Sequence, residues 1–495
     1  MVRQKSSLIS FLTLALSLTF VFSNAFVVQT SSSFEAFAQI RDNEDDDDED
    51  DEEDPDDNQL TDGQAIQGNA AGVIIDARGT LSLMKSSPKS KALWKARKQQ
   101  AMARLNPNLS KPSKMRKVSL TRLERLAAQS LEQNGKLPEE MQYLAGLIRI
   151  DYLFAYPETG DVVIAGPAEG FSIDDLGRPR GLRSGRATLE LQDLVVALRA
   201  FGPQAKPTQR ISVSIDPTQE GLARMQSFLN RVGGTVHPRQ TKDIVRGLRK
   251  SLGQQVVTFQ GISPNTHFAH VLAEADYRMK LIGIGLEQPP VDITTYVEKA
   301  NPGSVSRNAM ARWYFVPDYE SVRQSEDGLA IQMVGEGVKL VGANELVQAD
   351  GTRVDSGSGD RASKVFTLSF TRQYSALARR SPVYAQLRNL IDMSIAAAAI
   401  QQNDFFGQTN WAMELFGNED LFPVEVFEAP KTVATAVNAI WRGRQLMTPV
   451  GGGVAIQPLM ALDSENLLED ESGEVAESRA SVALEQLPEH VWWWD

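Results

Sequence analysis

The chain has 495 residues, with 51 Lys or Arg, 63 Asp or Glu and no Cys. This length allows two or three domains of ~100–200 residues, and the 42% hydrophobic content is enough for a sizeable core. The absence of Cys excludes disulfides, thiolate metal sites, iron–sulfur clusters and cysteine nucleophiles.

The N-terminus has the order of a secretory signal peptide: Arg3 and Lys5 precede an uncharged apolar stretch over residues 8–22. Small-residue cleavage sites end at Ala25 and at Ala38, and both remain open. An uncleaved membrane anchor is disfavoured, because a span needs ~20 apolar residues. We therefore expect a signal peptide within 1–38, export to the periplasm, cell envelope or medium, and no transmembrane span in the mature chain.

Charge is distributed unevenly along the chain. Residues 42–57 hold fourteen Asp or Glu and no base, whereas residues 78–125 hold fourteen Lys or Arg and one acid, Glu124. A like-charge block cannot bury apolar surface, so we expect residues 39–70 to be a disordered acidic linker that masks the basic stretch. Residues 461–495 are expected to be an acidic, flexible tail that ends in three Trp, with packing of these Trp onto the core as the alternative.

Residues 71–137 are expected to form a basic hairpin and helical segment. Two short apolar runs within 71–83 predict a hairpin. Helices are expected over 89–105, 121–135 and 138–144.

Residues 138–290 are expected to be an α/β-type subdomain, because strand and helix patterns alternate there. The expected strands are 148–156, 162–165, 211–215 and 256–260. The expected helices are one capped by Thr188, one starting at Asp216-Pro217, one over 241–252 and one opened by Ser263-Pro264.

Residues 291–460 are expected to be an α+β subdomain with a long helix. The strand patterns cover 313–316, 329–334, 338–341 and 365–370, and the middle two are expected to be joined across Gly335–Gly337. The helical pattern covers 376–402, with Pro382 starting or kinking it. The overall expectation is an α+β fold of mixed sheets with packed helices.

Four stretches together resemble a known family: 71–84, 210–226 (RISVSIDPTQEGLARMQ), 275–287 (ADYRMKLIGIGLE) and 312–320 (RWYFVPDYE). They are similar to an uncharacterised family of exported proteins from planctomycete bacteria, domain of unknown function 1598, over about residues 70–460. The resemblance implies an envelope or secreted protein. No catalytic residue is carried over, because these are packing motifs rather than chemical ones.

Two groups of residues are candidate sites. His267, His270 and Glu274 fall on one face of an expected helix, where imidazole and carboxylate groups are able to hold a metal; a solvated or helix-capping pair is the favoured interpretation. The second group is four arginines in one loop, whose guanidiniums are able to bind an anion: Arg178, Arg180, Arg183 and Arg186. The alternative is a solvated loop in which these arginines pair with the loop's own aspartates.

Three functions remain open. The favoured one is a non-enzymatic structural or interaction protein of the cell envelope, because the sequence shows no nucleophile motif or cofactor loop. The alternatives are a polyanion-binding protein that uses residues 78–125 and an envelope hydrolase that uses paired carboxylates, which leave no local signature. Polyanions or envelope proteins are the expected partners. No cofactor and no specific nucleic-acid motif is expected.

Overall fold

The computed structural model describes residues 72–84, 90–232, 237–300, 309–318, 320–347, 353–355, 361–438, 440–442, 445–447, 452–481, 484 and 487–495. The expected signal peptide (1–38) and acidic linker (39–70) lie outside these described residues. All of the described residues belong to one unit, Phe34–Asp495. Their secondary structure is α+β with mixed sheets, as expected.

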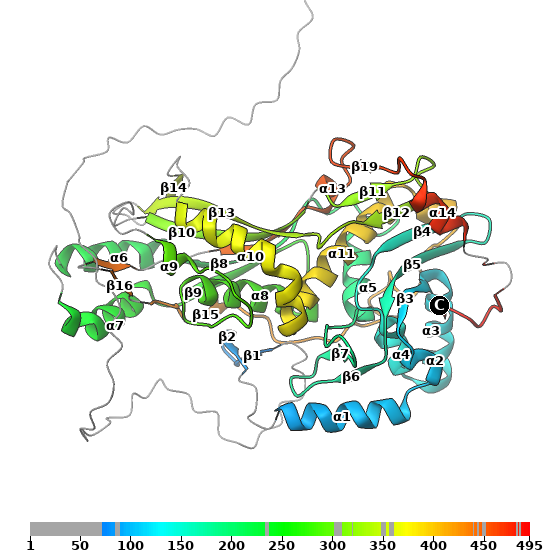
Figure 1. Cartoon of the computed structure of the whole chain (residues 1–495), viewed down its shortest axis with the longest axis horizontal. Coiled ribbons are helices and arrows are strands. Elements are labelled where there is room, and N and C mark those ends of the chain that lie inside the picture. Colours follow the sequence, from blue (N-terminus) through cyan, green and yellow to red (C-terminus); the bar gives the residue numbers. More distant parts are fainter. Residues whose placement is uncertain are drawn as a thin grey trace, which may run out of the picture. The chain divides into compact units, whose positions relative to one another are not determined.

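The larger sheet has nine strands and joins segments that are far apart in the sequence (Figure 1). β15 pairs with both β2 and β9, and β18 pairs with both β8 and β10. In spatial order the strands are β1 (Val73–Ile75), β2 (Thr80–Leu83), β15 (Thr432–Val433), β9 (Gln255–Gln260), β8 (Ile211–Pro217), β18 (Gly452–Ile456), β10 (Ala309–Pro317), β13 (Val338–Val347) and β14 (Arg353–Asp355).

The second sheet has seven strands and includes the C-terminus of the chain. In spatial order they are β19 (Leu468–Glu469), β11 (Val322–Gln324), β12 (Ala330–Met333), β4 (Tyr152–Tyr156), β5 (Asp161–Ala168), β3 (Ser113–Ser119) and β20 (Trp493–Trp494). Two further hairpins are formed by β6 (Phe171–Ile173) with β7 (Pro179–Gly181) and by β16 (Ile440–Arg442) with β17 (Gln445–Met447).

Helices pack on the nine-stranded sheet and on one another. The longer helices are α1 (Ser90–Arg104), α3 (Leu120–Asn134), α5 (Leu191–Ala200), α6 (Gln219–Val232), α7 (Thr241–Leu252), α8 (His267–Gly283), α10 (Arg361–Arg380) and α11 (Pro382–Gln402). The short ones are α2 (Pro107–Ser110), α4 (Glu139–Gln142), η1 (Leu144–Gly146), η2 (Pro238–Gln240), α9 (Tyr296–Lys299), α12 (Phe405–Gln408), α13 (Pro458–Ala461) and α14 (Glu474–Ala480).

The centre of the helical layer is α11, which contacts α5, α8 and α10. Its residues from Val383 to Ile400 are all buried. The run of small side chains at Ala396–Ala399 permits neighbouring helices to approach closely, and Pro382 supplies its first turn, where no backbone N–H is needed. α8 lies on β8, β18 and β10, so α5, α8 and α11 meet above this sheet.

Most of the expected elements are confirmed, and the difference over 365–370 has a clear cause. These residues belong to α10, where Phe366, Phe370 and Tyr374 are buried at helical spacing while Leu368 is exposed. A six-residue window of alternating apolar residues does not distinguish a strand from a helix, whereas the full 20-residue helix does.

The expected connection across Gly335–Gly337 joins two sheets rather than two paired strands. β12 pairs with β4 and β11 in the seven-stranded sheet, whereas β13 pairs with β10 and β14 in the nine-stranded one. Both Gly335 and Gly337 have positive φ, at 70° and 67°, a conformation that glycine adopts without strain.

Helix starts also differ from the expected residues in three places. α5 begins after Glu190 rather than at Thr188. Asp216 lies in β8, and the Thr218 hydroxyl accepts the backbone N–H of Gly221 instead. α8 is capped by Thr266, two residues after the expected Pro264.

The C-terminal residues differ from a flexible tail. Trp493 and Trp494 form β20, which pairs with Val118 and Lys117 of β3. Trp492 is buried, and the Asp495 carboxylate lies 2.8 Å from Nε of the fully buried Arg116. The alternative, packing of the Trp cluster onto the core, therefore matches the structure.

The expected segments 71–137, 138–290 and 291–460 all contribute strands to the nine-stranded sheet, through β2, β8 and β10. Within the part of the chain that the structure describes, no helix combines the length and apolar character needed to span a bilayer.

Candidate functional site

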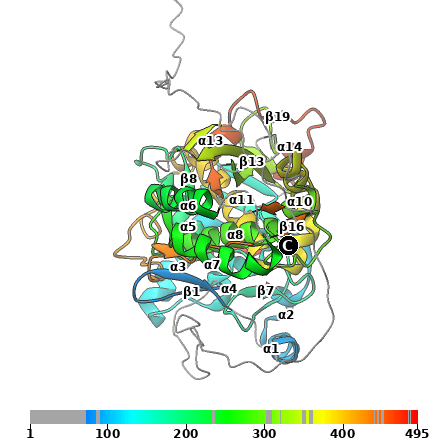
Figure 2. The same cartoon turned by 90° about the vertical axis from the view of Figure 1, so that its left-hand side faces the viewer.

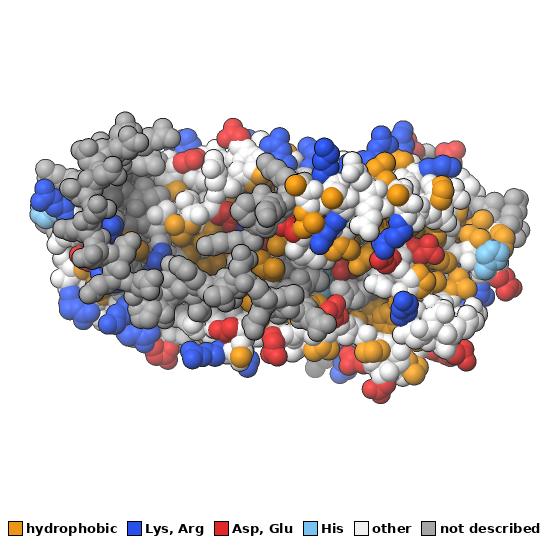
Figure 3. Space-filling model, turned by 90° about the horizontal axis from the view of Figure 1, so that it is seen from below, with side chains coloured by type: hydrophobic (Ala, Val, Ile, Leu, Met, Phe, Trp, Pro, Cys, Tyr) orange, Lys and Arg blue, Asp and Glu red, His pale blue; other side chains and the backbone are white. Residues whose placement is uncertain are grey.

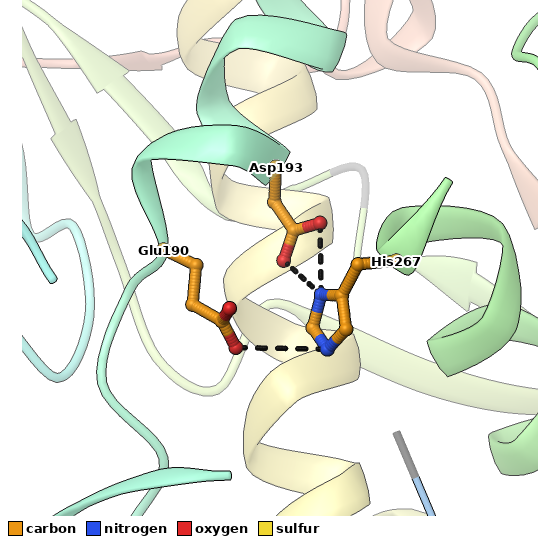
Figure 4. A group of neighbouring side chains, drawn as sticks. All are labelled: Glu190, Asp193 and His267. Carbon is orange, nitrogen blue, oxygen red and sulfur yellow. Dashed lines mark hydrogen bonds and ion pairs between the residues drawn. The ribbon is translucent and has the colours of Figure 1, made fainter. Parts of the chain in front are cut away.

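A buried polar cluster forms where α5, α8 and α11 meet. Glu190 is the residue before α5, Asp193 lies in its first turn, and His267 is the first residue of α8. Gln386 reaches the same place from α11. Figure 4 shows the two carboxylates pointing toward opposite nitrogens of the His267 ring. All four side chains belong to residues that are at most 4% exposed.

Each ring nitrogen of His267 has its own partners. Nδ1 lies 2.8 and 3.0 Å from the two Asp193 carboxylate oxygens, so a proton on Nδ1 is donated to Asp193. Nε2 lies 3.6 Å from Glu190 Oε1 and 3.4 Å from Nε2 of Gln386. The other Glu190 oxygen accepts the side-chain N–H of Gln192 at 2.9 Å.

The electrostatics of the cluster favour positive charge. Burial by itself lowers the pKa of His267, but the Asp193 and Glu190 carboxylates raise it to about 9. Burial raises the pKa of Glu190 to about 6, although the His267 ring opposes this and Asp193 adds to it. Two acids and one imidazole in a site closed to water are therefore able to bind a proton or another cation.

A second buried group continues from this cluster along α8. Arg178 Nη2 donates to both Glu274 oxygens at 2.7 and 3.0 Å, and Arg278 Nε donates to Glu274 Oε1 at 2.8 Å. The backbone N–H of Gly72, next to β1, donates to Glu274 Oε2 at 2.9 Å. A Cβ at position 72 would lie 1.8 Å from Arg178 Nη2, so only glycine fits over this ion pair.

The expected metal group of His267, His270 and Glu274 is divided in the structure. His267 contacts Asp193 and Glu190, and Glu274 pairs with arginines. His270 Nε2 lies 2.8 Å from the carbonyl oxygen of Glu428, and burial lowers the pKa of His270 to about 4. The neutral ring of His270 therefore donates to that carbonyl.

The four arginines of the expected anion site face different partners. Arg178 pairs with Glu274, Arg180 pairs with Asp174 and lies over the Trp94 ring, Arg186 donates to Ser375, and Arg183 is exposed. The backbone of this loop holds a carboxylate of the protein itself. The N–H groups of Arg183 and Ser184 donate to the buried Glu169 side chain at 2.8 and 2.9 Å.

The candidate residues predicted from the sequence include His267 but not Glu190, Asp193 or Gln386. The available signal was two acids three residues apart at the start of a helix whose other side chains are mainly apolar. Acids among buried apolar positions need a partner, but the sequence does not identify that partner when it lies 74 residues away in the chain.

Comparison with known proteins gives a match over part of the chain. Residues 213–296 match a family described as Protein of unknown function (DUF1598). The matched residues run from β8 through α6, α7, β9 and α8 to α9, and they contain two of the four stretches that carry the resemblance, apart from the first three residues of 210–226. Searches of curated proteins and of solved structures gave no match.

Proposed function

We propose that the chain is an exported, non-enzymatic interaction protein of the cell envelope that binds acidic polysaccharide on the surface of α6 and α7. Export is supported by Arg3 and Lys5 followed by the apolar residues 8–22. It is also supported by the resemblance to an exported planctomycete family.

The observation that indicates an anionic ligand is a group of exposed cations on α6, η2 and α7. Over residues 219–252 there are seven Lys or Arg and two acids, Glu220 and Asp243, so the net charge is 7 − 2 = +5. We name these seven residues the basic hairpin surface: Arg224, Arg231, Arg239, Lys242, Arg246, Arg249 and Lys250, all of them exposed.

The two helices hold this surface with a small apolar core of their own. Leu222, Ile244, Leu248 and Leu252 are buried between them. A Cβ at Gly247 would lie 2.2 Å from the Phe228 ring, so glycine permits the helices to approach closely. Figure 2 shows α6 and α7 next to each other, and Lys and Arg side chains gather at the left end of the face in Figure 3, the end at which α6 and α7 lie in Figure 1.

A binding role is supported over catalysis by the partners of the buried arginines and lysines. Arg178 and Arg278 pair with Glu274, Lys280 pairs with Asp276, and Arg116 pairs with Asp495. Each pair has at least one buried member and joins two turns of a helix or two distant segments. The basic hairpin surface instead faces solvent, where it attracts linear polyanions.

Two cations of residues 78–125 are used inside the fold, which leaves fewer of that segment's cations for a ligand. In that segment the Arg116 side chain is fully buried, and that of Arg122 is 14% exposed and paired with Asp161. An exported protein meets acidic polysaccharide in the envelope, so we choose polysaccharide over nucleic acid as the ligand.

The experiment measures retention on heparin, a linear acidic polysaccharide. Changing Lys242, Arg246, Arg249 and Lys250 to Ala should reduce the salt concentration needed for elution, because four cations that release counterions are lost. The affinity of the unchanged protein for heparin should fall steeply as salt rises.

A matched control removes four positive charges from the other basic segment, by changing Lys95, Lys98, Lys111 and Lys114 to Ala. This control should elute close to the unchanged protein. An equal loss of heparin retention in both variants, or no loss of retention in the α7 variant, would contradict the assignment to the basic hairpin surface. Tighter binding to duplex DNA than to heparin would overturn the choice of polysaccharide.

A further inference from the structure

We propose that Glu190, His267 and Gln386 bind a divalent transition-metal ion such as Zn²⁺, with Asp193 orienting the His267 ring. This inference is independent of the proposed polysaccharide binding, because the site is buried and lies on other elements.

The distances around His267 Nε2 fit ligands of one ion. Nε2 is 3.6 Å from Glu190 Oε1 and 3.4 Å from the Gln386 side-chain amide. Two ligand atoms that each lie about 2.0–2.1 Å from a tetrahedral ion are roughly 3.4 Å apart.

Two buried oxygens of the site have no hydrogen-bond partner: Oε1 of Glu190 and Oε1 of Gln386. An unpaired buried acceptor is costly, and an ion next to His267 Nε2 would contact Glu190 Oε1 directly and Gln386 Oε1 once its amide is rotated. Rotating the Gln386 amide by half a turn exchanges its oxygen and nitrogen and points the oxygen toward His267 Nε2, where a metal ligand is needed.

Asp193 has the position of a supporting residue. Its carboxylate holds Nδ1 of His267 at 2.8 Å, which leaves Nε2 to face the ion. This carboxylate–histidine–metal order is common in metal proteins, where the carboxylate fixes the tautomer and the ring orientation. The donor set of one imidazole nitrogen and several oxygens suits a first-row transition ion or Zn²⁺.

The ligand set differs from the one that helical spacing predicts. His270 donates to the Glu428 carbonyl and Glu274 pairs with Arg178 and Arg278, so neither faces the Nε2 position. The two sets therefore make opposite predictions for changes at His270, which serves as a matched control on the same helix.

The test uses the full chain, refolded from denaturant with one equivalent of Zn²⁺ and then passed over a desalting column. Mass spectrometry of the metal content should give one zinc per chain for the unchanged protein and for His270→Gln. Zinc should be lost in His267→Gln and in Glu190→Gln. Asp193→Asn should weaken zinc affinity by about 10–100-fold, as is typical of a supporting carboxylate.

A gain-of-affinity variant covers the case in which the loss variants do not fold. Gln386→Glu replaces a neutral ligand with a charged one, so the increase in melting temperature on adding Zn²⁺ should be larger than in the unchanged protein. The proposal is overturned if the unchanged protein binds no zinc, if His267→Gln retains it, or if His270→Gln loses it as fully. An equal or smaller thermal shift in Gln386→Glu also overturns it.

Discussion

Single buried carboxylates organise distant loops in this protein. Glu124, the one acid in the basic stretch, accepts the Trp411 indole N–H and the backbone N–H groups of Leu415 and Phe416. Glu169 performs the same role for the Gly181–Ser184 turn. Charge-assisted hydrogen bonds of this kind offset the cost of burying an acid. At the residue scale, an acid that looks isolated in the sequence therefore marks a long-range contact.

Asp392 on α11 is a buried acid whose surroundings make stability depend on pH. Its Oδ2 is 3.8 Å from Arg388 Nε. Burial, aided by the Asp151 and Glu336 carboxylates and opposed by Arg149, raises the pKa of Asp392 to about 8 from its ordinary 3.8. Between these two values the unfolded chain loses the proton and the folded protein keeps it, so this group reduces stability as pH rises from about 4 to about 8.

Asp392→Asn removes this titration while keeping an oxygen acceptor. The free energy of unfolding of the variant should rise relative to that of the unchanged protein by several kcal/mol between pH 5 and pH 8, at about 1.4 kcal/mol per pH unit. Urea unfolding at the two pH values measures the difference. Asp420→Asn, at an exposed acid, is the control and should follow the unchanged protein. The same pH slope in all three proteins would contradict the prediction.

Among the secondary-structure elements, the C-terminal residues add an edge strand and bury one Trp side chain in the core. β20 extends the seven-stranded sheet beyond β3. The Arg116 guanidinium lies 4.7 Å from the centre of the Trp493 ring and also donates to the carbonyls of Leu109 and Ala145. Arg116 therefore links the C-terminal strand to α2 and η1.

Trp492→Ala should destabilise the protein by about 3 kcal/mol, because Trp492 is 5% exposed and packs in the main core. Chemical unfolding measures the change. The control is His490→Ala, two residues earlier and exposed, which should leave stability within about 0.5 kcal/mol. Unchanged stability in both variants is the result expected of a flexible tail.

At the scale of the whole molecule, charge is divided between the inside of the fold and its surface. Part of the basic segment 78–125 is used internally, through Arg116 and Arg122. The α6 and α7 cations are exposed. The acidic run 42–57, which lies outside the described residues, belongs to the same chain, so its effective concentration at any basic surface is high, on the order of millimolar.

Deleting residues 42–57 should therefore raise heparin affinity, because a competing internal polyanion is removed. Titration with fluorescent heparin at low and high salt measures the change, which should shrink as salt rises. If the competition occurs at the basic hairpin surface, the deletion should have little effect in the Lys242, Arg246, Arg249 and Lys250 to Ala variant. Equal heparin affinity with and without residues 42–57 would leave the acidic run as a spacer.

Local structure and the excluded chemical classes follow from the residues and their spacing alone. Turn residues, caps and apolar periods predict the β1–β2 hairpin, α1, α7 and the break at Pro382, because each depends on neighbours within a few residues. The α+β class follows from the same patterns. The charge blocks and the absence of Cys are properties of composition alone.

Which distant segments meet depends on the packing of the whole fold. The pairing of β15 with β2, the crossing of the chain between sheets at Gly335–Gly337 and the contact of His267 with Asp193 each join residues whose local patterns do not name their partner. Helical spacing places His267, His270 and Glu274 on one face of α8, but packing against α5 and a loop gives each a different neighbour. A buried polar side chain needs a hydrogen-bond or ion-pair partner. Any element that packs against it can supply that partner, however distant it is in the sequence.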